Sequence, residues 1–186
     1  MKMASIFVTT GATVTFKRLI EITLDSKFIS HVQNLGYTKL IVQYGSQPDG
    51  ETLFKSLLEK LDIKSSLVDN YITGTTLYGF QISGFPFTND VKSIMESSDL
   101  IISHAGTGSI LDSLRLQKPL IVVINTNLMN NHQLEIANEL ENSNHLIKSS
   151  SEISDLLNKI DKIQITTLVS LPKPDFSVID NILQEI

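Results

Sequence analysis

The fold is decided by the stretch Leu100-Ile-Ile-Ser-His-Ala-Gly-Thr-Gly-Ser109. Three consecutive apolar residues predict a short strand that is buried on both faces. Gly106 and Gly108 follow at once, and apolar residues at Ile110, Leu111 and Leu114 then recur with the period of a helix. The stretch therefore predicts a strand, a tight turn and a helix, whose first backbone N–H groups could approach an anion.

The same alternation of strand and helix patterns extends in both directions from this stretch. Short apolar runs predict strands at residues 6–8, 40–42, 77–82, 100–102 and 120–124. Apolar residues spaced three and four apart predict helices within residues 16–24, 54–61, 91–95, 110–114, 131–140 and 152–160. This order predicts an α/β fold with a Rossmann-like, mostly parallel sheet. Residues 62–76 show no clear period and are interpreted as a surface connection.

The length of 186 residues is typical of one domain, which we place at residues 1–171. From residue 163 to 171 the pattern is extended, and Pro172 and Pro174 then stop it. A short helix with an apolar face is predicted in the tail, residues 172–186. That face either packs back on the domain or contacts a partner, and the sequence leaves both alternatives open.

Composition excludes several classes of protein. The net charge of −5 argues against a nucleic acid partner, because no overall positive field is available to neutralise phosphates. The absence of cysteine excludes disulfides and zinc–thiolate sites. The longest apolar run, residues 120–124, is too short to cross a bilayer, and the N-terminus lacks the apolar core of a signal peptide. These observations favour a cytoplasmic protein.

The turn at Gly106 and Gly108 does not match the two best-known phosphate-binding motifs. A dinucleotide fingerprint would need a third glycine where Leu111 stands, and a P-loop would need lysine where Ser109 stands. An alternative is that both glycines only permit a tight turn. If the turn does bind a ligand, its position at a helix N-terminus fits a diphosphate.

Three more polar segments follow predicted strands or lie near them. Gly11 and Thr13, with Thr10, form a second turn at the same edge of the sheet, where threonine hydroxyls could bind phosphate. Asp112 lies one helical turn beyond the first loop and could accept hydrogen bonds from a ribose. Residues 130–133 (Asn-Asn-His-Gln) offer donors and acceptors suited to a sugar. Each segment also has a plainer interpretation as a turn, a solvated carboxylate or a helix cap.

The sequence carries no evident metal site. No two aspartates are separated by a single residue, so the Asp-x-Asp metal clamp of many glycosyltransferases is missing. No histidine and glutamate cluster has the spacing of metal ligands either. We therefore expect no tightly bound metal or cofactor, and a divalent cation is expected at most to stimulate.

Residues 103–123, together with Asn131-His132-Gln133, closely resemble the soluble subunit of the two-subunit UDP-N-acetylglucosamine transferase of the dolichol pathway, in its fungal form. The resemblance extends over nearly the whole chain, from residue 7 to the final helix. It implies glycosyltransferase family 28 and the C-terminal, donor-binding half of a GT-B fold.

The resemblance also implies a role for each matching residue. The ribose contact would be Asp112, where many relatives have glutamate, and Asn130 stands where the family often has aspartate. The donor diphosphate would be held by Gly11, Thr13, Ala105, Gly106, Thr107, Gly108 and Ser109. The uracil loop would be Phe87 and Thr88. The sugar contacts would be Asn131, His132 and Gln133.

The activity implied by the resemblance is transfer of N-acetylglucosamine from UDP-N-acetylglucosamine to N-acetylglucosaminyl-diphospho-dolichol, forming a β1-4 linkage with inversion. A membrane-anchored, acceptor-binding subunit would be the partner, so the chain would lie on the cytosolic face of the endoplasmic reticulum. The general base is unassigned. His104 and His132 are weak candidates, for which structural or sugar-contact roles are favoured.

Two rival hypotheses remain. One is a UDP-binding module without transferase activity. The other is a Rossmann oxidoreductase, which the missing third glycine disfavours. The residues after the second strand, 43–46 (Gln-Tyr-Gly-Ser), also lack the acidic side chain that binds the ribose 2′-hydroxyl of NAD.

Overall fold

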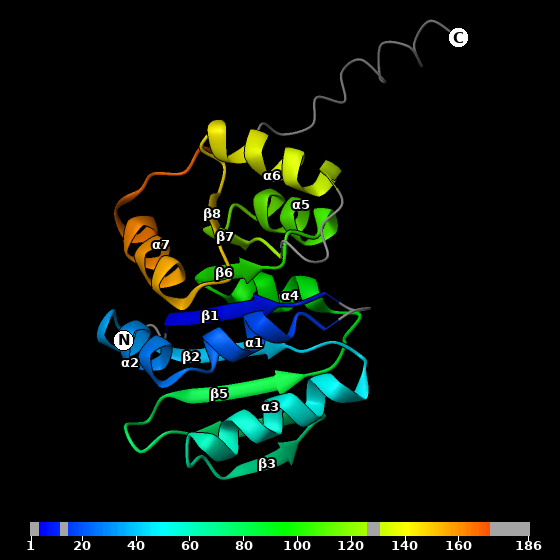
Figure 1. The fold of residues 1–186 in the computed structure, drawn as a ribbon, viewed down its shortest axis with the longest axis vertical. Helices are drawn as coiled ribbons and strands as arrows, with labels where there is room; N and C mark the ends of the chain where they lie inside the picture. Colours follow the sequence, from blue (N-terminus) through cyan, green and yellow to red (C-terminus); the bar gives the residue numbers. More distant parts are fainter. Residues whose placement is uncertain (1–3, 12–14, 126–130, 172–186) are drawn as a thin grey trace, which may run out of the picture.

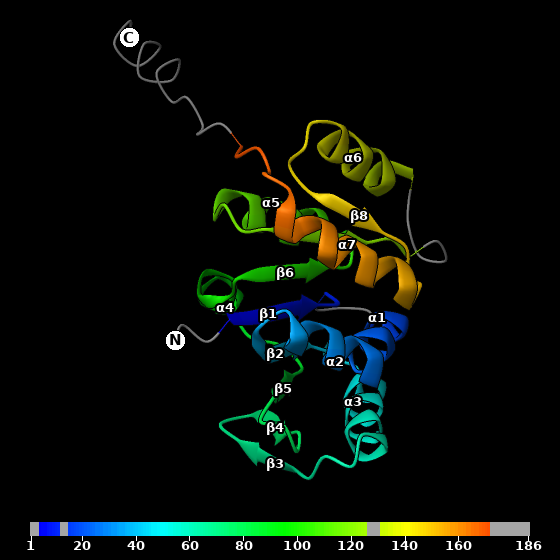
Figure 2. The same cartoon turned by 90° about the vertical axis from the view of Figure 1, so that its left-hand side faces the viewer.

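A computed structural model describes residues 4–11, 15–125 and 131–171 of the chain. Its centre is one eight-stranded sheet with the order β3-β4-β5-β2-β1-β6-β7-β8, which runs from the bottom to the top of Figure 1, with β4 labelled in Figure 2. The strands are β1 (Ala4–Thr9), β2 (Tyr37–Gln43), β3 (Ser65–Val68), β4 (Tyr71–Thr75), β5 (Gln81–Phe85), β6 (Leu100–Ser103), β7 (Leu120–Val123) and β8 (Ile147–Ser149). All neighbours pair in parallel except β3 with β4 and β4 with β5, which confirms the predicted mostly parallel sheet.

Helices cover both faces of this sheet (Figures 1 and 2). They are α1 (Lys17–Thr23), α2 (Ser26–Asn34), α3 (Pro48–Lys60), α4 (Val91–Ser97), α5 (Thr107–Arg115), α6 (Asn131–Asn142) and α7 (Ile153–Ile165). Buried residues of α1, α2, α3 and α7 form one core cluster with one face of the sheet. Those of α4, α5 and α6 form a second cluster with the other face.

The central strand explains why the predicted strands lack alternation of apolar and polar residues. In β1, Ile6 and Val8 belong to the first cluster, whereas Phe7 between them belongs to the second. All three side chains are fully buried. A strand covered by helices on both faces needs apolar residues at every position, which is the pattern of a buried parallel sheet.

The chain reverses its direction of winding at β1. It passes from β1 to β2 and β5 on one side, and then returns to pair β6 with the other side of β1. The segments that follow β1 and β6 therefore leave the sheet side by side at its carboxyl edge, the edge where the parallel strands end. Open α/β sheets bind their ligands at such a switch point.

Two sequence predictions were wrong in the region of β3 to β5. Residues 62–76, predicted to be a surface connection, contain the antiparallel strands β3 and β4. All four residues of β3 are exposed, and their sequence Ser-Ser-Leu-Val shows neither an apolar run nor alternation, so no pattern reveals this edge strand. The strand predicted at residues 77–82 begins only at Gln81, because Leu77, which is 96% exposed, lies in the turn before it.

Smaller differences concern elements of weak pattern. Helix α2 and strand β8 were not predicted, and α7 continues to Ile165 although an extended pattern was predicted from residue 163. The other strands and helices lie where their patterns predicted them. No helix within the described ranges is both long and apolar enough to cross a membrane.

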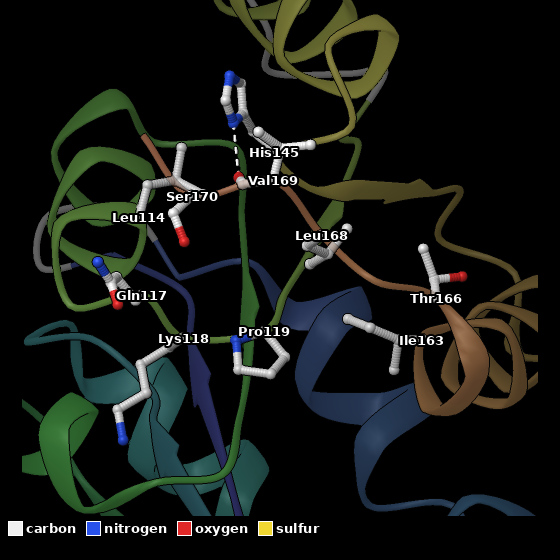
Figure 3. A pocket seen from close by; sticks show the side chains of 10 residues that line it. All are labelled: Leu114, Gln117, Lys118, Pro119, His145, Ile163, Thr166, Leu168, Val169 and Ser170. Atoms are coloured by element: carbon white, nitrogen blue, oxygen red, sulfur yellow. Dashed lines mark hydrogen bonds between the residues drawn. The ribbon is translucent and has the colours of Figure 1, made fainter. Parts of the chain in front are cut away.

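Residues 166–171 fasten the end of the described chain to the domain. The backbone N–H of Val169 donates to Asn144 O at 2.9 Å, and Nδ1 of His145 donates to Val169 O at 2.7 Å. Figure 3 shows the latter bond beside a small pocket of about 180 Å³. Leu168 packs on the first cluster and Leu171 on the second. The helix predicted in the tail, residues 172–186, lies outside the described residues, so the domain boundary stays a prediction.

Candidate functional site

The two glycine turns meet at the carboxyl edge of the sheet, as the sequence predicted. Thr9 at the end of β1 pairs with Ser103 at the end of β6. Beyond this pair, the backbone N–H of His104 donates to Thr9 O at 3.1 Å. The turn that contains Gly11 and the loop that contains Gly106 are thus neighbours, although they lie about half the chain apart in sequence.

The imidazole ring of His104 bonds to the same carbonyl. Its Nδ1 lies 3.2 Å from Thr9 O, and because a carbonyl only accepts, Nδ1 carries the proton and donates it. The side chain is largely buried. Burial lowers the pKa of His104 below its ordinary value of 6.5, and the bond to Thr9 opposes this shift only in part. The ring is therefore neutral at pH 7, with the lone pair on Nε2.

The ring occupies the space that side chains would need on both glycine turns. A Cβ atom added to Gly106 would lie 2.5 Å from His104 Nε2, and one added to Gly11 would lie 2.7 Å from the same atom. Gly11 also has a φ of 87°, which other residues adopt only with strain. The sequence left two explanations open for these glycines, the approach of a ligand and a tight turn. The structure adds a third, because the His104 ring occupies the space that a side chain would need.

The start of α5 presents free backbone donors. Intrahelical bonding begins with Ile110, whose N–H donates to Gly106 O at 3.0 Å, so the N–H groups of residues 107–109 point out of the helix end. The helix dipole adds roughly half a positive charge there. A Cβ atom added to Gly108 would meet no atom of the described residues within 4 Å, and Ala105 has a φ of 45°, a strained value of the kind found at functional sites.

Gln43, at the end of β2, braces the turn after β1. The Thr9 hydroxyl donates to its Oε1 at 2.7 Å, and the Thr10 hydroxyl donates to its backbone oxygen at 2.9 Å. Thr10 is buried, so the idea that its hydroxyl binds phosphate is wrong, because that proton is already donated within the protein. Thr13, the other predicted phosphate contact in this turn, lies outside the described residues. The sequence did not predict this bracing role of Gln43. The role depends on the pairing of β2 with β1, which no local pattern of residues reveals.

Two of the predicted nucleoside contacts have side chains exposed to a ligand. The Asp112 carboxylate on α5 is 57% exposed and only loosely paired with Arg115, at 3.9 Å, so it can accept hydrogen bonds. The Phe87 side chain is 50% exposed, which leaves its ring available for stacking. The Thr88 hydroxyl accepts from the backbone N–H of Asp90 at 3.1 Å and so also shapes the turn before α4.

A hollow of about 500 Å³ adjoins Phe87 and Thr88. Its other walls come from Tyr44 after β2, Glu51 in α3 and the β3–β4 hairpin. This volume lies within the range of small-molecule sites. The hairpin that the sequence analysis missed therefore forms one wall of the hollow beside the predicted uracil loop.

The predicted sugar contacts open the next helix along the edge. Residues 131–133 (Asn-His-Gln) begin α6, which follows β7, the neighbour of β6. This places their backbone on the carboxyl side of the sheet, but their side chains and Asn130 lie outside what the structure describes. Their role, and that of His132 in catalysis, stays a prediction.

Metal ligands do not gather anywhere in the described part of the chain. No three acidic or histidine side chains there lie close enough together to hold an ion. The arrangement can instead hold an anion through the backbone N–H groups at the start of α5, with a polar rim for a nucleoside.

Acid is expected to destabilise the fold through His104. Because its folded-state pKa lies below 6.5, the unfolded chain binds a proton that the folded chain excludes. The stabilisation is fully present above pH 6.5 and is lost as the pH falls through the folded-state pKa. Denaturant titrations at several pH values should show this loss, and His104→Asn should lack it. Identical slopes in the two proteins would contradict the assignment.

Comparison with known proteins identifies the family. The model of the "Glycosyltransferase family 28 C-terminal domain" matches residues 5–175. A protein of Debaryomyces hansenii, named UDP-N-acetylglucosamine transferase subunit ALG13, is 42% identical over 158 residues, which cover 74% of each chain. A solution NMR structure of ALG13 superposes with a TM-score of 0.75 at 31% identity, covering 98% of this chain and 96% of the other.

A more distant match supports the fold alone. The crystal structure of MurG from Acinetobacter baumannii has a TM-score of 0.59 at 16% identity, covering 89% of this chain and 42% of that enzyme. The fold is thus that of the C-terminal half of a GT-B glycosyltransferase, as the sequence predicted. The chain belongs to the family of the glycosyltransferase 28 C-terminal domain, and its relatives are transferase subunits.

Proposed function

We propose that this chain is the donor-binding subunit of a heteromeric transferase. It binds UDP-N-acetylglucosamine, and the complete enzyme moves the N-acetylglucosamine to N-acetylglucosaminyl-diphospho-dolichol, with inversion and a β1-4 linkage. The observation that carries the proposal is the pair of glycine turns at the switch point, with the free N–H groups of α5 beside them. The name of the relatives supports UDP-N-acetylglucosamine as the donor.

The chemistry follows from charge. As the acceptor hydroxyl attacks the anomeric carbon, negative charge grows on the leaving diphosphate. Backbone N–H groups at residues 107–109, with the dipole of α5, stabilise that charge without reorganising. Removing one such donor commonly costs about 2.7–4 kcal/mol in the barrier. Asp112 orients the ribose, Phe87 and Thr88 meet the uracil, and residues 131–133 meet the sugar.

The acceptor half is assigned to a second, membrane-anchored subunit. The described residues form one Rossmann-like unit, and the chain covers 42% of the longer solved chain of similar fold. A cleft between two domains is needed to enclose both substrates. The general base stays unassigned: His104 and His132 are weak candidates on this chain, and the partner is the alternative source. The complex would lie on the cytosolic face of the endoplasmic reticulum. No tightly bound cofactor is part of the proposal, and added divalent cations would at most stimulate.

The test is transfer of labelled N-acetylglucosamine to a lipid-diphosphate acceptor, with the chain alone and with a membrane-anchored partner. Activity is expected only with the partner. Gly108→Ala should reduce that activity by at least about tenfold, because the new methyl group stands where the diphosphate approaches the helix, and such misplacement is costly. Its melting temperature should not fall, because no atom of the described residues lies within 4 Å of the new methyl group. Ser154→Ala, on the exposed side of α7, is the matched control and should retain full activity.

Three results would change the proposal. Robust turnover by the chain alone would remove the need for a partner. UDP binding without transfer, in the presence of a competent partner, would favour a nucleotide-binding module. Tight binding of NAD together with failure to bind UDP would revive the oxidoreductase.

A further inference from the structure

We propose that His104 is a positioning residue that sets the spacing between the turn after β1 and the loop after β6, and that Gly106 is glycine because of the His104 ring rather than because of the ligand. The proposal concerns the protein's own packing. Its consequence for donor binding rests on the proposed function.

The first argument is the place of the ring. His104 directly follows β6, yet its Nδ1 donates to Thr9, the last residue of β1, at 3.2 Å. Its other end, Nε2, approaches the backbone of both turns, since Cβ atoms added to Gly11 and Gly106 would lie 2.7 and 2.5 Å from it. The ring thus contacts both sides of the switch point and fixes their separation.

The second argument is the backbone of Gly106. Its φ of −72° and ψ of 125° are values that any residue adopts without strain. Conformation therefore does not explain glycine at this position, as it does at Gly11 with its φ of 87°. The three nearest atoms that a Cβ at Gly106 would meet all belong to the His104 ring. A Cβ at Gly108, two residues further on, would meet no atom of the described residues within 4 Å.

A consequence follows for the site. An alanine at position 106 would push the ring away, and the ring could move only by weakening its bond to Thr9 or by separating the two loops. The start of α5 would then shift relative to the turn at Gly11. A diphosphate held between them would lose contacts on one side.

The test is a double-mutant cycle between positions 104 and 106 in the full chain, with the melting temperature as the first readout. In His104→Asn, the side-chain amide keeps an N–H donor near the position of Nδ1 but removes the atoms around Nε2. Gly106→Ala alone should lower the melting temperature by about 2–4 °C or more. The same change made on top of His104→Asn should cost little, because the clash is gone. Gly108→Ala, the matched control, should not show this dependence on residue 104.

The second readout is the dissociation constant for UDP. His104→Ala, which removes the bond to Thr9, should weaken UDP binding by roughly fivefold to tenfold. His104→Asn should bind UDP almost as tightly as wild type, a result that a purely space-filling role of His104 would not predict. Equal UDP affinity in wild type and His104→Ala would overturn the positioning role.

The outcomes separate this proposal from the proposed function. Additive effects on the melting temperature would overturn the explanation of Gly106, whatever the chain binds. Strong coupling between positions 104 and 106 in a protein that fails to bind UDP would uphold that explanation and reject the donor site instead.

Discussion

Phe54→Ala is expected to lower the free energy of unfolding by about 3–5 kcal/mol, the range measured when a buried phenylalanine is truncated. The Phe54 side chain on α3 is fully buried, and its ring lies 5.4 Å from that of Tyr44. Gly84 on β5 is flat against the ring, since an added Cβ would lie 2.4 Å from it. Such a close-packed neighbourhood cannot collapse to fill the cavity, so most of the loss should persist.

Denaturant unfolding of wild type and variant measures this loss. Glu59→Ala, an exposed change on the same helix, is the control and should stay within about 0.5 kcal/mol of wild type. Because natural domains are stable by only about 5–15 kcal/mol, the Phe54 variant should be close to unfolding under mild denaturant. A loss below about 1 kcal/mol would show that α3 does not pack on the sheet as described.

Gly50→Ala should destabilise the fold by about 3 kcal/mol and also impair the site. Gly50 is buried in the first turn of α3, where an added Cβ would lie 2.4 Å from the backbone oxygen of Tyr44. A backbone atom cannot move aside as a flexible side chain does, so overpacking here lies at the upper end of its usual cost. The gain in helix propensity, about 0.5–1 kcal/mol, is too small to compensate.

The effect on the site follows from one hydrogen bond. In the wild-type protein, the hydroxyl of Thr15 donates to the backbone oxygen of Tyr44 at 3.0 Å. This is the oxygen that Gly50→Ala would displace, and the bond anchors the chain a few residues after the turn at Gly11. UDP affinity should therefore fall together with stability. Thermal melting and UDP titration measure both effects, with Gly108→Ala as a glycine change that should spare stability. A Gly50→Ala protein as stable as wild type would contradict the packing of α3 against the end of β2.

Most of the architecture was predictable because it depends on local patterns. A strand buried on both faces must be apolar at every position, and residues 100–102 and 120–124 are uninterrupted apolar runs of this kind. The order of strands and helices then requires parallel pairing, which brings the turns after β1 and β6 to one edge. The β3–β4 hairpin was not predictable, because the four residues of β3 (Ser-Ser-Leu-Val) form neither an apolar run nor an alternation of apolar and polar residues.

The sequence by itself determined the α/β class, the position of the two glycine turns and, through its resemblance to relatives, the family. Only the tertiary structure decided what these residues do for one another. It showed that the Thr10 hydroxyl donates its hydrogen bond to Gln43, and that Gly106 faces the ring of His104. His104 and Thr9 are separated by 95 residues along the chain. A contact of this kind depends on how distant strands pair, so no local spacing of residues can reveal it.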